Sequence, residues 1–103
     1  MMKIIYSDEA IFSLEEVVKF LIDNWTHIEL DVFEFELENF LENINDEIIT
    51  YPKVDGFKNL HFALIGNKQV KVYFFKNDQV LEIILFLPSK ANPNRLKYLF
   101  KIN

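Results

Sequence analysis

The chain has 103 residues and a net charge of −5, and half of its residues are apolar, with eleven Phe, two Gly and no Cys. The absence of Cys excludes disulfides, thiolate metal sites and cysteine nucleophiles. A chain of this length buries roughly two-thirds of its unfolded surface on folding, so it can form a packed core without disulfides or a structural metal. We therefore expect residues 1–103 to form a single domain. The sequence shows no signal peptide and no apolar run near the ~20 residues that span a bilayer, which predicts a cytoplasmic protein without a membrane partner.

The charges divide between the two halves of the sequence. Residues 1–52 carry thirteen acidic residues against Lys3 and Lys19, a net of −11. Residues 53–103 carry nine Lys or Arg against three acidic residues, a net of +6. This asymmetry predicts two surfaces with different roles, although a solvated acidic helix explains the first half equally well.

The first half is predicted to begin with a short strand and a helix. Lys3 to Tyr6 has the β-branched composition of a strand. Ser7 is a favourable N-cap, and Asp8 and Glu9 in the next turn suit the positive end of a helix dipole. The apolar residues that follow at helical spacing are Ile11, Leu14, Val18, Leu21, Ile22 and Trp25.

A second helix is predicted directly after the first. Thr26-His27-Ile28-Glu29 has the form of a capping box, and Pro52 and Gly56 end the helical pattern. Such a short join between two helices predicts an antiparallel helical hairpin. The expected core residues of the second helix are Leu30, Phe33, Leu37, Phe40, Leu41, Ile44 and Ile48, with Ile28, Val32 and Phe35 widening the apolar side near its start.

After Gly56 the apolar period changes from about 3.6 to 2, which predicts strands over residues 60–65, 70–75 and 80–87. Turn residues separate them at 66–68 and 76–79, and the strand over 80–87 is apolar on both faces, as expected of a central strand. Residues 94–101 form a short basic tail. The predicted fold class is α+β in the order β-α-α-β-β-β, a helical hairpin packed on a small antiparallel sheet.

Several segments resemble one known family when taken in order. They are Ile5-Tyr6-Ser7-Asp8-Glu9-Ala10 with Leu14-Glu15-Glu16, then Asp23-Asn24-Trp25, then Tyr73, Asn77-Asp78 and Leu81-Glu82-Ile83-Ile84, and finally Lys90-Ala91-Asn92-Pro93-Asn94-Arg95-Leu96. With this element order, they are similar to the RelE/ParE superfamily of bacterial toxins from type II toxin–antitoxin systems. The resemblance covers about residues 3 to 98.

The resemblance implies a growth-inhibiting toxin that a cognate antitoxin neutralises, with no small-molecule cofactor. Three functions stay open. A ParE-like toxin binds and blocks DNA gyrase without hydrolysing a substrate, and a RelE-like toxin is a ribosome-dependent mRNA endonuclease. The third is a non-toxic binding protein that keeps the fold, which is suggested by Lys71 and Lys90 at positions where the family usually has Arg.

Candidate site residues lie mostly in the basic half. Residues expected to bind the target or the antitoxin are Lys71, Tyr73, Lys90, Asn92, Arg95, Lys97 and Tyr98. For RNA cleavage the candidates are His61 and Tyr98 for proton transfer and Lys71 and Lys90, helped by Arg95, for stabilising a pentavalent phosphate. Each has a simpler explanation as a core or solvent-facing residue.

Two further expectations concern metals and the antitoxin. Two His far apart in the sequence give no support for a metal site. We expect an acidic antitoxin tail to lie against a single surface formed by Lys71, Lys90 and Arg95.

Overall fold

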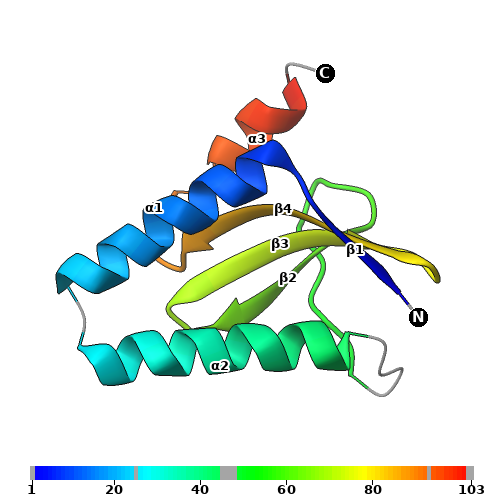
Figure 1. Ribbon diagram of the computed structural model, residues 1–103. Coiled ribbons are helices and arrows are strands. Elements are labelled where there is room, and N and C mark those ends of the chain that lie inside the picture. Colours follow the sequence, from blue (N-terminus) through cyan, green and yellow to red (C-terminus); the bar gives the residue numbers. More distant parts are fainter. Residues whose placement is uncertain (1, 25, 45–48, 93, 102–103) are drawn as a thin grey trace.

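The protein combines a helical hairpin with a four-stranded sheet and a short C-terminal helix (Figure 1). The structure is a computed structural model that describes residues 2–24, 26–44, 49–92 and 94–101. The elements are β1 (Lys3–Tyr6), α1 (Asp8–Asn24), α2 (His27–Asn43), β2 (Leu60–Ile65), β3 (Val70–Lys76), β4 (Val80–Pro88) and α3 (Asn94–Lys101). The predicted order of the first six elements is confirmed. The predicted basic tail is itself a helix, α3.

The sheet has the strand order β1-β4-β3-β2. β2, β3 and β4 form the expected antiparallel meander, with a register shift between Tyr73 and Phe74 of β3. β1, however, pairs parallel with β4, with Lys3 opposite Val80, so the sheet is mixed and not wholly antiparallel as predicted. The helical hairpin between β1 and the meander makes this possible, because a parallel pair needs a long crossover connection. The central position predicted for the strand over 80–87 is confirmed.

Local signals set where the two hairpin helices begin. The Ser7 hydroxyl accepts a hydrogen bond from the Ala10 backbone N–H (3.0 Å) and donates one to the Ile84 carbonyl of β4 (3.1 Å). Thr26 and Glu29 form the predicted capping box, which satisfies backbone N–H groups at the start of α2. Both predicted helix starts are therefore confirmed, and Ser7 also fixes α1 against the sheet.

The hairpin covers one face of the sheet, called here the inner face. Side chains from this face and from the helices form one continuous core, while a second cluster lies on the opposite, outer face. The fully buried members of the inner cluster include Leu21, Phe33, Phe74 and Phe86. On the outer face, Leu96 of α3 packs beside Leu60, Tyr73 and Leu85.

Ser13 is a buried polar residue within this apolar packing. Its hydroxyl donates to the Ala10 carbonyl (3.1 Å) and accepts from the Phe86 backbone N–H of β4 (2.9 Å). Both polar functions of the side chain are thus paired, as burial requires. The contact ties the middle of α1 to the central strand.

Some residues predicted for the helix core face solvent instead. Ile11 is 48% exposed and Ile22 is 61% exposed in α1, and Ile28 and Phe35 of α2 are 73% and 63% exposed. The buried positions of α1 are Ala10, Ser13, Val17 and Leu21. Ala10 and Ser13 are small and let the first half of α1 approach β4 closely, whereas Ile11 and Ile22 lie on the sides of the helix. Ile48 and Trp25, also predicted for the core, lie outside the described residues.

In the part of the chain that the structure describes, no helix has the length and apolar character needed to cross a bilayer.

Candidate functional site

The outer face of the sheet carries a cationic pocket, called here the basic pocket. It has a volume of about 280 Å³. Its lining includes three lysines, Lys53, Lys71 and Lys97, together with Asp55, Phe62 and Tyr73. The lysines come from three separate parts of the chain: the segment before β2, strand β3 and helix α3. Three cations around one small hollow favour an anionic ligand or an acidic segment of a partner.

Strand alternation places Lys71 and Tyr73 in this pocket. Successive side chains of a strand point to opposite faces, so Lys71 and Tyr73 share the outer face while Val72 and Phe74 point to the inner one. The Lys71 ammonium lies 4.9 Å from the centroid of the Phe62 ring on β2. This cation–π contact favours a defined position of the charge over the outer face.

Tyr73 forms the buried floor of the pocket. It is 4% exposed, and its ring packs against that of Phe62 with centroids 6.1 Å apart. Burial raises the pKa of the Tyr73 phenol above its usual value, so the phenol is neutral at physiological pH. A neutral phenol beside lysines leaves the net charge of the pocket positive. Tyr73 is therefore a core residue that also lines the pocket, and its contribution to a binding site stays a prediction.

Lys53 and Asp55 are lining residues that the sequence reasoning missed. Residues 52–54 run beside β2, where the Phe62 backbone N–H donates to the Pro52 carbonyl (3.1 Å) and Val54 N–H donates to Leu60 (2.9 Å). Lys53 forms an isolated bridge with His61. The segment has no apolar alternation, so the sequence gives no signal that it returns to the sheet. Lys53 resembles the predicted residues Lys71 and Lys97 only in its positive charge.

His61 is separated from the basic pocket by the sheet. It follows Leu60 and precedes Phe62, both of which belong to the outer cluster, so its side chain points to the inner face. There its ring stacks on Phe74 with centroids 5.8 Å apart. The His61 Nδ1 atom is buried without a hydrogen-bond partner among the described residues. The structure thus does not bring His61 together with Lys71 as a proton-transfer group beside a cation.

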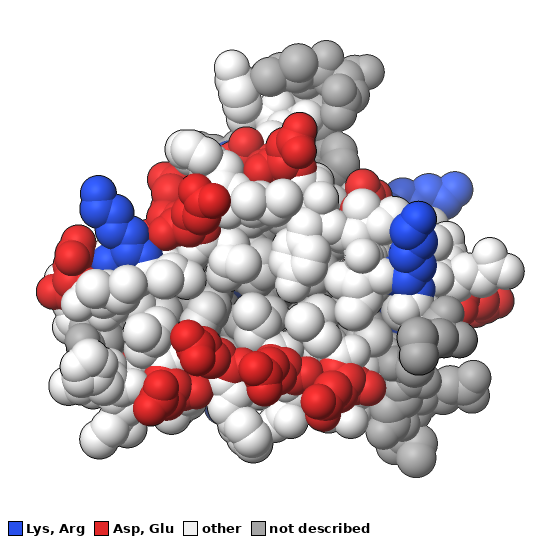
Figure 2. Space-filling model, viewed as in Figure 1, with Lys and Arg blue, Asp and Glu red and all other residues white. Residues whose placement is uncertain are grey.

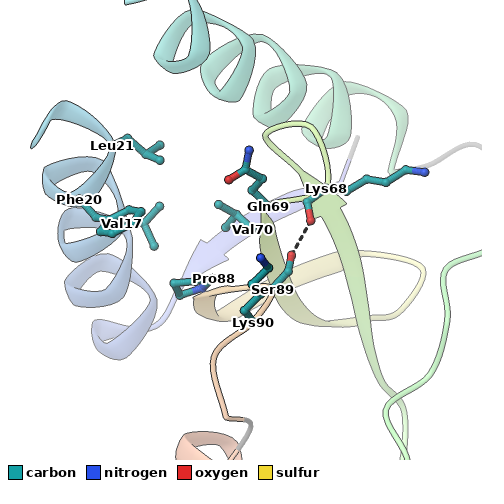
Figure 3. A pocket seen from close by; sticks show the side chains of 9 residues that line it. All are labelled: Val17, Phe20, Leu21, Lys68, Gln69, Val70, Pro88, Ser89 and Lys90. Atoms are coloured by element: carbon teal, nitrogen blue, oxygen red, sulfur yellow. Dashed lines mark hydrogen bonds between the residues drawn. The ribbon is translucent and has the colours of Figure 1, made fainter. Parts of the chain in front are cut away.

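Lys90 lies at a different hollow, between α1 and the ends of β3 and β4 (Figure 3). This hollow has a volume of about 550 Å³. Figure 3 shows Val17 and Leu21 pointing into it from α1, opposite Val70 and Pro88, whereas the Lys68 side chain points away. The Ser89 hydroxyl donates a hydrogen bond to the Lys68 carbonyl (2.6 Å) and so joins the two strand ends. The lining is mostly apolar, with Lys90 at its edge.

Arg95 is engaged within the protein. Its guanidinium donates to Glu9 of α1 (3.1 Å from Nε) and to Glu16, about two helical turns further along α1 (2.9 Å from Nη2). Partial burial lowers the pKa of Arg95, but the hydrogen bonds to Glu9 and Glu16 outweigh burial and leave the pKa above its usual value. Arg95 therefore fastens α3 to α1, and it presents less of its charge to a partner than the sequence suggested.

The remaining candidates lie on or beside α3. The Asn92 side-chain oxygen accepts a hydrogen bond from the Asn94 backbone N–H (3.0 Å), which satisfies one donor at the start of α3. Tyr98 is 66% exposed. Lys97 lines the basic pocket. Asn92 thus has a structural task, while Lys97 and Tyr98 are available to a partner.

The expected single surface of Lys71, Lys90 and Arg95 is not formed. Lys71 lies in the basic pocket, Lys90 at the hollow beside α1, and Arg95 against the acidic residues of α1. Strand alternation and the fold of α3 separate them. Among the described residues, no three His, Cys, Asp or Glu side chains gather in a way that suits a metal ion.

Comparisons with known proteins find similar structures but no similar sequences. No family model matches the chain, and no curated protein matches its sequence. A chain of the chromosomal ParDE TA system from P. aeruginosa has a TM-score of 0.67 and 9% identity, over 87% of this chain and 98% of that chain. The isolated E. coli RelE toxin has a TM-score of 0.57 and 12% identity, over 100% of both chains. The chain therefore has the RelE/ParE fold that its sequence predicted.

Proposed function

We propose that this chain, which has the RelE/ParE fold, is the toxin of a type II toxin–antitoxin pair and acts in the cytoplasm by binding DNA gyrase, as ParE-like toxins do. The observation that carries the proposal is this fold, shared over nearly the whole chain with a chain of a ParDE system. The chemistry of the site supports binding in preference to cleavage. RNA cleavage needs a base, an acid and cations around one phosphate, and here the sheet separates His61 from Lys71.

The basic pocket is the proposed contact surface for an acidic partner. Its three lysines are on a face that the helical hairpin leaves uncovered, and its neutral Tyr73 adds no negative charge. The proposed cognate antitoxin has an acidic tail that reaches this pocket, with its charge opposite Lys71 and Lys97. Because Arg95 is held by Glu9 and Glu16, its contribution to this contact is smaller than that of the two lysines.

A RelE-like mRNA endonuclease is the second candidate, and one observation favours it: the RelE toxin structure covers the whole chain. In that function Lys71 and Lys97 would stabilise the phosphate, and the exposed Tyr98 would be the proton-transfer group nearest in sequence to Lys97. The site lacks a His at the pocket, because His61 faces inward. A third function, a non-toxic binding protein with this fold, uses the same pocket without a growth effect.

Three measurements distinguish these functions. The first is growth of a bacterium after induced expression, and we expect arrest that co-expression of the adjacent reading frame relieves. The second is gyrase supercoiling with purified protein, for which we expect inhibition near stoichiometric amounts. The third is mRNA cleavage mapping during in-vitro translation, for which we expect intact message.

A matched pair of variants tests whether the basic pocket is responsible for the inhibition of gyrase. Lys71→Ala with Lys97→Ala should weaken the inhibition at least tenfold, whereas Lys19→Ala on α1 should not. Cleaved message with normal supercoiling would replace the proposal by the RelE-like function. Continued growth after induction, with folded protein present, would leave the non-toxic binding protein.

A further inference from the structure

The two hairpin helices turn apolar sides toward each other and toward solvent. In α1, Leu14, Val18 and Ile22 recur at intervals of four residues, and therefore lie along one side of the helix. In α2, Leu30, Leu37 and Leu41 follow one another at intervals of seven and four residues, and therefore also lie along one side of the helix. These six residues are called here the hairpin surface.

Contacts elsewhere fix which side of each helix this is. Glu36 of α2 accepts a hydrogen bond from the Asn67 backbone N–H (2.6 Å), so that side of α2 faces the β2–β3 turn. Glu9 and Glu16 of α1 face Arg95 of α3. The opposite sides of both helices are left to face one another, and the partly buried leucines of the hairpin surface pack on the inner core.

The hairpin surface is accessible to a partner. Leu14, Val18 and Ile22 line a hollow of about 400 Å³ whose other lining residues are Glu15 and Lys19. Ile22 is 61% exposed, which is high for an Ile in a folded protein. Each helix has 17 residues, so the surface extends about 25 Å, the length of a helix of some five turns.

Acidic residues flank this surface on both sides. In α2, Asp31, Glu34, Glu38 and Glu42 follow one another at intervals of three or four residues beside the leucines. Glu15 lies at the edge on α1. Figure 2 shows the result: a mostly uncharged band crosses this face between acidic groups over α1 and a row of acidic groups over α2, with one basic side chain beside the acidic groups over α1 and another at the right-hand end of the band.

In the part of the chain that the structure describes, these acids have no cationic partner. Lys19 is the only Lys or Arg in the two helices, which together carry eleven Asp and Glu. None of Glu15, Glu34, Glu38 and Glu42 has an ion pair among the described residues, where the two pairs found are those of Arg95. An uncompensated row of like charge next to apolar side chains costs repulsion that a cationic partner relieves.

We propose that the hairpin surface binds a cationic amphipathic helix of a partner protein, with its apolar side chains on Leu14, Val18, Ile22, Leu30, Leu37 and Leu41 and its Lys or Arg residues beside the acids of α1 and α2. The apolar band supplies the area that a helix in a groove buries, and the two acidic edges select its charge. An anionic membrane is the wrong charge for this face. The site is distinct from the basic pocket, which lies on the other side of the sheet, and the inference does not depend on the proposed function.

The test uses a defined probe with the whole protein. The probe is a dye-labelled peptide of about 18 residues, with Leu at every third or fourth position and Lys on both sides of the Leu stripe. The control peptide has Glu in place of each Lys. Fluorescence anisotropy at physiological salt should show at least tenfold tighter binding of the Lys peptide.

Two variants separate a docked helix from general attraction to an acidic protein. Glu34→Lys with Glu38→Lys should weaken the Lys peptide at least tenfold, whereas Asp78→Lys in the β3–β4 turn should leave binding within twofold. Ile22→Asp adds an acid but removes apolar contact, so it should also weaken binding at least fivefold. All of these side chains are exposed, and circular dichroism should show an unchanged fold.

Three outcomes would overturn the inference. Tighter or unchanged binding to the Ile22→Asp variant would mean attraction by net charge alone. Equal binding of the Glu peptide would remove the selection by charge. Self-association of the protein that Ile22→Asp abolishes would assign the surface to a second copy of this chain.

Discussion

The hairpin surface and the basic pocket lie on opposite sides of one sheet, and the charges beside them have opposite signs: acidic residues flank the hairpin surface, whereas lysines line the basic pocket. The hairpin is built entirely from the acidic first half of the sequence, while the pocket takes its lysines from the second half, at Lys53, Lys71 and Lys97. Between them lie the sheet and its two apolar clusters, one on each face. The difference shows that part of the charge division in the sequence becomes a division in space, because the sheet lies between the acidic residues of the hairpin and the lysines of the basic pocket. The two proposals together assign this fold two contact surfaces that select partners of opposite charge.

The largest effect is expected from a substitution in the inner core, because the folding of the whole chain, and with it both surfaces, depends on this packing. Phe74 is 1% exposed and packs against Phe40, Tyr51 and His61, with centroids 5.2 to 5.8 Å away. Phe74→Ala should lower the free energy of unfolding by about 3–5 kcal/mol. Phe35→Ala, at a 63% exposed position of α2, should change it by less than about 0.5 kcal/mol. Urea denaturation measures both, and similar losses would mean that Phe74 is not central to the core.

A smaller effect is expected at the joint between hairpin and sheet. Ser13→Ala removes the acceptor for the Phe86 N–H and leaves that donor buried and unpaired. This should cost about 1–3 kcal/mol of unfolding free energy. Ser89→Ala is the matched control, since its hydroxyl bonds an accessible carbonyl and its loss should cost well under 1 kcal/mol. Equal effects of the two substitutions in thermal denaturation would contradict the role of Ser13.

The smallest effect tests the basic side alone. Lys71→Glu with Lys97→Glu should reduce binding to a polyanion such as heparin. The variant has fewer cations at the pocket, so its binding releases fewer counterions from the polyanion. The salt concentration at which the protein leaves a heparin column should fall clearly. The single change Lys19→Glu, on the acidic side of the molecule, should have little effect. An equal shift for Lys19→Glu would show that net charge alone, without a defined pocket, governs the binding.

The sequence predicts local structure well because the signals are local. The Thr26–Glu29 capping box and the Ser7 cap each lie within four residues, and the alternation at 60–65 and 70–75 is visible without tertiary contacts. The parallel pairing of β1 with β4 depends on residues some 77 positions apart, and no local pattern encodes its direction. The helix α3 was missed because its eight residues are too few to show a clear period.

The site is less predictable than the fold for the same reason. Lys71 and Tyr73 became candidates through the resemblance to the RelE/ParE superfamily. Lys97 became one because it lies close in sequence to Lys90 and Arg95, beside the Asn-Pro turn. Arg95 binds Glu9 and Glu16 because α3 lies beside α1 in the tertiary structure, and no local sequence pattern predicts this position of α3. Exposure of Ile22 likewise depends on which side of α1 the sheet leaves open, and helical spacing alone does not distinguish an apolar side that faces the core from one that faces a partner.

The pairing of Lys3 with Val80 has a consequence for how the chain is made. A ribosome releases β1 first, yet the strand beside which β1 lies is synthesised among the last residues of the sheet. Contacts between such distant positions slow folding, because a long loop must close before they form. We therefore expect the nascent protein to complete its sheet only after β4 has left the exit tunnel.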